Sequence, residues 1–381
     1  MIKKLSNILI VLIFSMSLIF SGCAVKDAVA DPQVTAGILK DEEFGGILID
    51  IGIDEFNSHG FTFGDSVKVS FNNGDTLENV PYYSGYYGSI GDLLLCGYPG
   101  SSNVAIKRNY GDDTWEEFVS TGTDSVTVTL EEKGKYLDTE ELYSLTYSDD
   151  RNDFDSDIAF ANFREVKGGN LMEKSFYRSA SPCDNLHNRA KYANRLSEEN
   201  SIGFVINMSD SEEKYKSHRE KEDFESFYYD SLYNDGKVCV LALTANYMSP
   251  EFTEKLSGAF LKMAEEEKPP ALIHCVEGKD RTGFACTLLL ALADASVEEI
   301  TRDYMITYEN YYGITEGSEP ERYNAVKKSV DDFLYFLSGA EKGSDLNTAD
   351  IKKGAEDYLR SGGLSDEEIE EIEIYITGGV N

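Results

Sequence analysis

A cysteine and an arginine separated by five residues are the part of this sequence whose types and spacing indicate chemistry most directly. Cys275 and Arg281 enclose the run Val-Glu-Gly-Lys-Asp, and a short apolar stretch, residues 271–273, precedes them. A second apolar stretch, residues 284–293, follows and is long enough for a helix. This order predicts a strand, a tight loop and a helix.

A loop of this kind is suited to binding an anion. Backbone N–H groups that converge at a helix N-terminus form a phosphate site. Arg281 adds a planar guanidinium that can hold two phosphate oxygens at once. The helix N-terminus and nearby cations also favour the thiolate, which is the nucleophilic form of a cysteine such as Cys275. Thr282 follows the arginine, where its hydroxyl could donate to that sulfur.

These groups together predict nucleophilic catalysis at phosphorus. Cys275 would attack the phosphorus atom, and water would then hydrolyse the phosphocysteine intermediate. Fixed N–H groups and Arg281 would stabilise the charge that builds on the equatorial oxygens. A buried free cysteine at the end of a core strand is the structural alternative for Cys275. That alternative does not explain the pattern of residues around it.

The run from His274 to Gly283 resembles the signature loop of the cysteine-dependent protein tyrosine phosphatase superfamily. Its Gly-Lys-Asp-Arg-Thr-Gly ending is most similar to the atypical bacterial secreted tyrosine and lipid phosphatases, over about residues 158–375. The resemblance implies hydrolysis of phosphomonoesters, phosphotyrosine first among them. It also implies that the catalytic Cys275, Arg281 and Thr282 stand in a phosphate-binding loop with His274, Val276, Glu277, Gly278, Lys279 and Gly283.

Two further roles follow from this resemblance, each with a structural alternative. Many members supply an aspartate as general acid from a loop after the strand that we expect at residues 238–243, but residues 244–249 contain no acid. Asp280 is therefore the candidate acid, and its alternative role is to orient Arg281 or cap the helix. Arg178 is expected near the loop as a possible substrate contact, or else as part of a structural ion pair.

The sequence leaves other functions open. Lys279 would place a second cation at the site, which suits a phosphoinositide or inositol phosphate; phosphoserine and phosphothreonine are further options. A non-catalytic, lipid-anchored phosphate-binding surface protein and a rhodanese-like sulfurtransferase are the remaining alternatives. We expect no cofactor and no metal, because the four histidines, at 59, 187, 218 and 274, show no metal-ligand spacing.

The hydrophobic pattern changes near residue 148 and predicts two domains. Residues 34–147 contain short alternating runs separated by turn signals and predict a small all-β domain, a barrel or sandwich. Residues 147–154 are polar and predict a linker. Residues 155–381 alternate helical and strand patterns and predict an α/β catalytic domain, in which helices flank a central, mostly parallel sheet. The helices after residue 296 are expected to pack over the core and to contribute no residues to the site.

The first 22 residues are expected to be a signal peptide. Lys3 and Lys4 precede an apolar core, residues 8–20, that is short for a membrane span. Phe20-Ser21-Gly22-Cys23 resembles a bacterial lipobox, which implies lipidation of Cys23 and a lipoprotein at the cell membrane or cell surface; an uncleaved anchor or a secreted protein is the alternative.

Composition agrees with export and limits the partners. Lys and Arg number 35 against 69 Asp and Glu, a formal net charge of −34, which opposes binding to nucleic acid. The expected partners are a phosphorylated protein or phosphoinositide substrate and the membrane. The six cysteines show no disulfide framework.

Overall fold

The computed structural model describes residues 31–42, 45–89, 91–109, 111, 113–266 and 270–379. The predicted signal peptide and Cys23 lie outside these residues. Contacts group the chain from Pro32 to Asn381 into one unit, so the predicted boundary between two domains stays a prediction.

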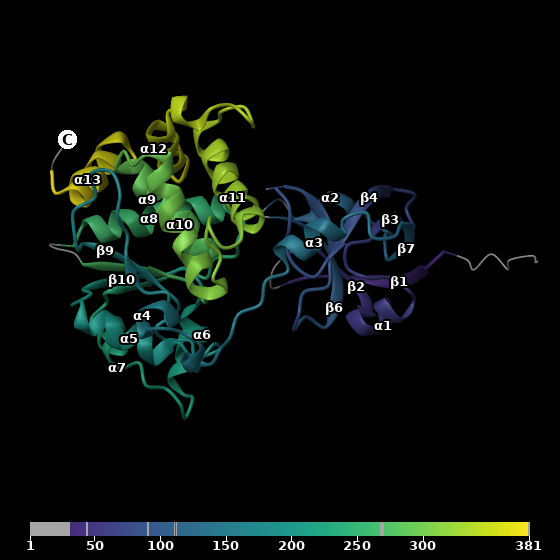
Figure 1. Cartoon of the computed structure of the whole chain (residues 1–381), viewed down its shortest axis with the longest axis horizontal. Helices are drawn as coiled ribbons and strands as arrows, with labels where there is room; N and C mark the ends of the chain where they lie inside the picture. Colours follow the sequence, from purple (N-terminus) through teal and green to yellow (C-terminus); the bar gives the residue numbers. More distant parts are fainter. Residues whose placement is uncertain are drawn as a thin grey trace, which may run out of the picture. The chain divides into compact units, whose positions relative to one another are not determined.

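The N-terminal half forms a closed barrel with the strand order β1-β2-β6-β5-β4-β3-β7 (Figure 1). Neighbouring strands are antiparallel except β4 and β5, which pair in parallel. The strands are β1 (Gln33–Lys40), β2 (Ile47–Gly52), β3 (Ser66–Phe71), β4 (Thr76–Tyr83), β5 (Leu93–Cys96), β6 (Asn103–Arg108) and β7 (Ser125–Glu132). The predicted all-β structure is therefore confirmed, and of the two expected forms it is the barrel. Three short helices accompany it: α1 (Ile53–Ser58), α2 (Thr114–Phe118) and α3 (Leu137–Tyr143).

Alternation of apolar residues explains how this barrel fills its interior. On β3, Val67, Val69 and Phe71 are buried, while Lys68 and Ser70 between them are partly exposed. Side chains of successive strand residues point to opposite faces, so one face of each strand supplies the core of a small barrel.

The C-terminal half is built on a five-stranded sheet with the order β11-β10-β12-β9-β8. Four strands run parallel, and β8 pairs antiparallel with β9 at one edge. The mostly parallel sheet is therefore confirmed in part, with an antiparallel edge that the sequence did not reveal. The strands are β8 (Arg164–Glu165), β9 (Phe176–Ser179), β10 (Phe204–Asn207), β11 (Val238–Val240) and β12 (Ala271–His274).

Helices cover both faces of this sheet (Figure 1). Ile206 of β10 packs into one apolar cluster, and its neighbour Val205 packs into another. Burial on both faces is what allows a parallel sheet to be apolar throughout. The helices are α4 (Asp157–Phe160), α5 (Ala190–Glu199), α6 (Glu212–Arg219), α7 (Phe227–Asn234), α8 (Pro250–Ala264), α9 (Asp280–Leu292), α10 (Val297–Tyr312), α11 (Pro320–Ser338), α12 (Ile351–Ser361) and α13 (Asp366–Thr377), with 3-10 turns at Arg151–Asp153 and Leu346–Thr348.

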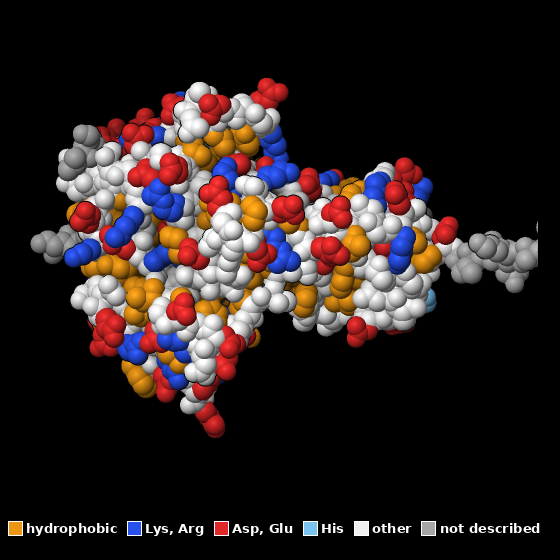
Figure 2. Space-filling model, viewed as in Figure 1, with side chains coloured by type: hydrophobic (Ala, Val, Ile, Leu, Met, Phe, Trp, Pro, Cys, Tyr) orange, Lys and Arg blue, Asp and Glu red, His pale blue; other side chains and the backbone are white. Residues whose placement is uncertain are grey.

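Local features of the described chain agree with its sequence. Capping boxes form at Ser296 and Ser365, at the starts of α10 and α13. The five cysteines among the described residues are all free and buried. Among the described helices, none combines the length and the apolar character that crossing a bilayer requires. Figure 2 shows basic side chains lying among acidic ones on the visible face.

Candidate active site

The loop that carries the predicted chemistry lies between β12 and α9. β12 is hydrogen-bonded to β10 on one side and β9 on the other, so Cys275 lies at the carboxyl end of a central strand. Ligands of α/β sheets bind at this edge. The Cys275 side chain is almost fully buried, with 3% of its surface exposed.

Gly278 lets the loop turn tightly against β9. Its φ is +68°, a left-handed conformation that favours glycine. A Cβ atom at this position would lie 2.2 Å from the backbone oxygen of Ser179. Gly278 is thus required both by its backbone conformation and by the close approach of the two chains.

Every carbonyl group from Cys275 to Lys279 accepts a hydrogen bond from the surrounding protein. The donors, in loop order, are His274 Nδ1 (3.1 Å), the Ser181 N–H (2.9 Å), Tyr311 Oη (2.6 Å), Arg178 Nη2 (2.9 Å) and the Gly283 N–H (2.7 Å). The N–H groups of residues 276–279, in contrast, have no acceptor among the described residues. A loop whose carbonyls are held by the protein in this way leaves its N–H groups available to an anion.

Arg178 supports the loop from behind. Its side chain is fully buried, donates to the Gly278 carbonyl and forms an ion pair with Asp303 at 2.5 Å. Arg164 lies beside the same carboxylate, at 3.5 Å. Through these contacts Arg178 positions the loop. They do not support the expected contact between Arg178 and the substrate, which stays a prediction.

Helix α10 contributes to the site, contrary to the expectation that the helices after residue 296 only cover the core. It supplies Asp303, which pairs with Arg178, and Tyr311, which holds the Glu277 carbonyl. Its Thr307 hydroxyl accepts hydrogen bonds from Arg164 and from Asn162, whose amide also donates to Gly278. The sequence pattern did not reveal these roles, because helical periodicity indicates which residues are buried but not which distant residues they contact.

Arg281 and Thr282 occupy the first turn of α9. Arg281 Nη1 donates to the backbone oxygen of Leu243 at 2.7 Å. Leu243 belongs to the segment after β11, in which residues 241–249 contain no acid. The Thr282 hydroxyl is buried and has no partner among the described residues.

His274 is completely buried beside the loop. Burial lowers its pKa to about 4, although its hydrogen bond to the Cys275 carbonyl and the nearby Asp210 act in the opposite direction. The imidazole is therefore neutral at neutral pH, and the bond to the carbonyl makes Nδ1 the protonated nitrogen.

Lys279 stands between two carboxylates of the same loop. Its ammonium lies 3.5 Å from Glu277 and 3.7 Å from Asp280. Burial lowers the pKa of Lys279, but the two carboxylates outweigh burial and raise it well above its ordinary value. The lysine is thus charged, and much of that charge is neutralised within the loop.

A second polar cluster lies among buried residues near β10. Oxygens of Asp184 and Asp210 lie 3.8 and 3.4 Å from His218 Nε2, and the three ligand atoms all lie within 4.8 Å of one another. Lys214 approaches Asp210 at 3.6 Å. Such a group could hold a metal ion, but polar contacts among the three side chains alone give the same arrangement. Because Asp184 and His218 are far apart in the sequence, spacing alone gave no sign of the cluster.

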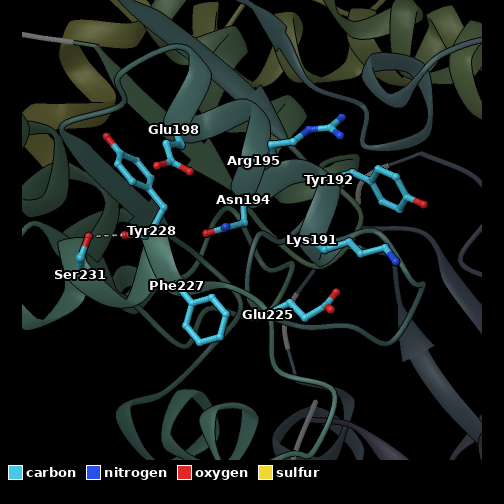
Figure 3. Close-up of a pocket in the computed structure, with 9 residues that line it drawn as sticks. All are labelled: Lys191, Tyr192, Asn194, Arg195, Glu198, Glu225, Phe227, Tyr228 and Ser231. Carbon is cyan, nitrogen blue, oxygen red and sulfur yellow. Dashed lines mark hydrogen bonds between the residues drawn. The ribbon is translucent and has the colours of Figure 1, made fainter.

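A shallow hollow lies elsewhere, between α5 and α7 (Figure 3). No residue of the loop lines it; its lining residues are Lys191, Tyr192, Asn194, Arg195, Glu198, Glu225, Phe227, Tyr228 and Ser231.

A cysteine and an arginine enclosing a nest of N–H groups at the carboxyl edge of an α/β sheet define the cysteine phosphatase class of site. The sequence model of the tyrosine phosphatase family matches residues 159–377, more than half of the chain. The chain belongs to this family.

Individual relatives are more distant. A tyrosine-protein phosphatase of Nostoc commune is 27% identical over 135 residues, which are 34% of this chain and 45% of the relative. The chain thus spans less than half of that protein's length.

Two solved structures of the Siw14 catalytic core also match. The S. cerevisiae structure, a PP-IP phosphatase in complex with citrate, has a TM-score of 0.28 and 18% identity, and the match covers 47% of this chain and 91% of that chain. The other has a TM-score of 0.25 and 18% identity, with 44% and 96% covered. Similarity at this level does not bear on the substrate.

Proposed function

We propose that this protein is a cysteine-dependent phosphatase that hydrolyses phosphomonoesters, with phosphotyrosine as the preferred substrate class. The observation that carries the proposal is the loop from Cys275 to Arg281, in which each carbonyl is held by the protein while N–H groups remain available to a phosphate. Family membership supports the same conclusion.

In the first step, the Cys275 thiolate attacks phosphorus. The S–P bond forms as the ester P–O bond breaks, and a proton passes to the leaving oxygen. The loop N–H groups and Arg281 stabilise the equatorial oxygens, and the bond from Arg281 to Leu243 fixes the guanidinium before substrate arrives. In the proposal Asp280, which lies at the start of α9, supplies the proton.

In the second step, water attacks the phosphocysteine and the S–P bond breaks. Asp280 takes the proton of the water, and inorganic phosphate leaves. The Thr282 hydroxyl, buried and without a partner among the described residues, is available to donate to the departing sulfur. This donation stabilises the thiolate as it re-forms.

The balance of charge around the loop favours a substrate with one phosphate group. A multiply phosphorylated inositol ring needs several free cations, whereas Lys279 is already shared between Glu277 and Asp280. The name of the Nostoc relative, a tyrosine-protein phosphatase, points the same way. Phosphoinositides and inositol phosphates are the alternative substrate class, and phosphate binding without turnover is the alternative function.

Phosphate release by the full chain and by Cys275→Ser tests the proposal under reducing conditions. The substrates are a phosphotyrosine peptide, phosphoserine and phosphothreonine peptides, and a phosphoinositide panel. We expect turnover by the wild type alone, with the highest kcat/KM on phosphotyrosine. A higher kcat/KM on a phosphoinositide than on the phosphotyrosine peptide would reassign the substrate class. Absence of phosphate release from every substrate would overturn the proposed phosphatase activity.

We further propose that the protein acts at the cell membrane or surface through a lipid on Cys23. The support is the lipobox-like Phe20-Ser21-Gly22-Cys23 after an apolar core. Labelling with a radioactive fatty acid should mark the wild type and not Cys23→Ser. Equal labelling of both would contradict the proposal.

A further inference from the structure

The segment predicted to be a plain linker contacts the phosphate loop. The Tyr147 hydroxyl donates a hydrogen bond to the Glu277 carboxylate, and the Tyr147 ring stacks on Tyr311 with 4.9 Å between ring centroids. Tyr311 in turn donates to the backbone oxygen of Glu277 at 2.6 Å. One pair of stacked tyrosines thus holds both the side chain and the main chain of Glu277.

Arg189 fixes this segment to the protein core. Its side chain is 2% exposed, and its guanidinium lies 4.8 Å from the centre of the Tyr147 ring. The same guanidinium donates to the Ser148 carbonyl at 2.8 Å and to Asp149 at 2.6 Å. A buried cation with this many partners places the Tyr147 hydroxyl at a defined position.

Glu277 is the residue of the loop that needs such control. Burial raises the pKa of its carboxyl, but Lys279 and the Tyr147 hydrogen bond outweigh burial and hold the pKa below its ordinary value. The group is therefore a negatively charged carboxylate within a loop that binds anions. If it were free to turn, it would repel a phosphate dianion at short range.

We propose that Tyr147 is a positioning residue of the phosphate site: its hydroxyl fixes the Glu277 carboxylate beside Lys279, so that the loop accepts a phosphate dianion. This inference rests on the proposed phosphate-binding role of the loop. The family match begins at residue 159, so Tyr147 is supplied by the chain outside the matched region. The segment that follows the barrel thereby becomes part of the site.

A double-mutant cycle in the full chain tests the inference. The proteins are the wild type, Tyr147→Phe, Glu277→Gln and the double variant, and the probes are inorganic phosphate, by calorimetry, and p-nitrophenyl phosphate, by turnover. We expect Tyr147→Phe to raise the phosphate Kd and the KM by about five- to tenfold, with kcat changed by less than about twofold. In the Glu277→Gln background, the same change should raise the Kd by less than about twofold.

One control variant, and one expectation for a single variant of the cycle, keep the result interpretable. Tyr228→Phe removes a tyrosine hydroxyl that donates to the Ile202 carbonyl at 2.8 Å, remote from the loop, and should leave the phosphate Kd unchanged. Glu277→Gln alone should tighten phosphate binding by about twofold or more, because it removes a negative charge from the site. This second expectation can be tested even if Tyr147→Phe does not fold.

The outcomes separate this inference from the proposed function. Equal effects of Tyr147→Phe in both backgrounds, or no effect in either, overturn the positioning role, even where the enzyme turns over. If the protein binds phosphate with the expected coupling between Tyr147 and Glu277 but hydrolyses no substrate, the positioning role is supported and the proposed phosphatase activity is overturned. A wild type that neither binds phosphate nor hydrolyses its ester overturns both.

Discussion

Arg281 donates a hydrogen bond from Nη1 to the backbone oxygen of Leu243, at 2.7 Å. The bond joins the start of α9 to the segment that follows β11, so the guanidinium is oriented by the fold. Arg281→Lys keeps the charge but loses the planar fork, and we expect kcat/KM to fall by about 100-fold or more. Steady-state kinetics on p-nitrophenyl phosphate measures this loss.

Arg322→Lys is the matched control, because Arg322 of α11 is partly exposed and pairs with Glu319 at the N-cap of that helix. It should change kcat/KM by less than about twofold. Activity of Arg281→Lys close to that of the control would contradict the role of the guanidinium.

The leaving group distinguishes the two roles considered for Asp280. If Asp280 is the general acid, Asp280→Asn should lower kcat on a phosphotyrosine peptide by about 100-fold or more. The loss should be much smaller on p-nitrophenyl phosphate, whose phenolate leaves more readily without a proton. If Asp280 only caps α9 or orients Arg281, both substrates should lose activity by the same factor. Parallel kcat measurements on the two substrates therefore decide between the roles.

Arg178 should contribute to stability and phosphate affinity together. Arg178→Met leaves the buried Asp303 without its closest cation. We therefore expect the free energy of unfolding, measured in urea, to fall by about 3 kcal/mol. The Gly278 carbonyl also loses a donor, which should weaken phosphate binding. The matched control is Arg302→Met, whose exposed pair with Glu298 should contribute less than about 0.5 kcal/mol. Similar unfolding free energies for the two variants would contradict the supporting role.

The part of the site that could be predicted from sequence is the part that is local in sequence. Cys275, Gly278, Arg281 and Thr282 lie within eight consecutive residues, and a strand, a nest and a helix N-terminus are short-range structures. Three of the five donors that hold the loop carbonyls come instead from Arg178, Ser181 and Tyr311, which only the fold brings to the loop. No periodicity encodes such contacts, so the sequence pattern does not distinguish Tyr311 and Asp303 from residues that only cover the core.

The fold shows the same division. Strongly periodic or apolar elements such as β3, β10 and α8 can be recognised in the sequence, whereas a glycine inside α12 can be explained only by the packing of the fold. Gly354 lies inside α12, and glycine disfavours a helix in isolation. A Cβ there would lie 2.1 Å from the Leu337 oxygen, so the close packing of α11 and α12 requires this glycine. Strand β4 is hard to recognise in the sequence because Glu78, Asn79 and Pro81 interrupt its apolar alternation.

Chelation tests whether the Asp184, Asp210 and His218 cluster holds a metal that activity needs. The proposed mechanism uses only side chains and backbone groups, so we expect kcat/KM to be unchanged after treatment with EDTA. His218→Ala should then alter stability more than kcat. A loss of activity in EDTA that zinc restores, and that His218→Ala reproduces, would show that the cluster is a metal site.

His274 should make stability depend on pH in a defined direction. Its pKa is about 4 in the folded protein and 6.5 ordinarily, so between these values the unfolded chain binds a proton that the folded protein does not. Stability therefore falls as pH decreases from about 6.5 to 4, by about 3 kcal/mol on account of this residue. Carboxyl groups ordinarily titrate near the lower end of this range, so the comparison must be between matched proteins. Urea unfolding of the wild type and of His274→Gln, from pH 4.5 to 7.5, should show the wild type losing stability more steeply. Parallel curves would mean that the buried imidazole takes up its proton as readily in the folded protein as in the unfolded chain.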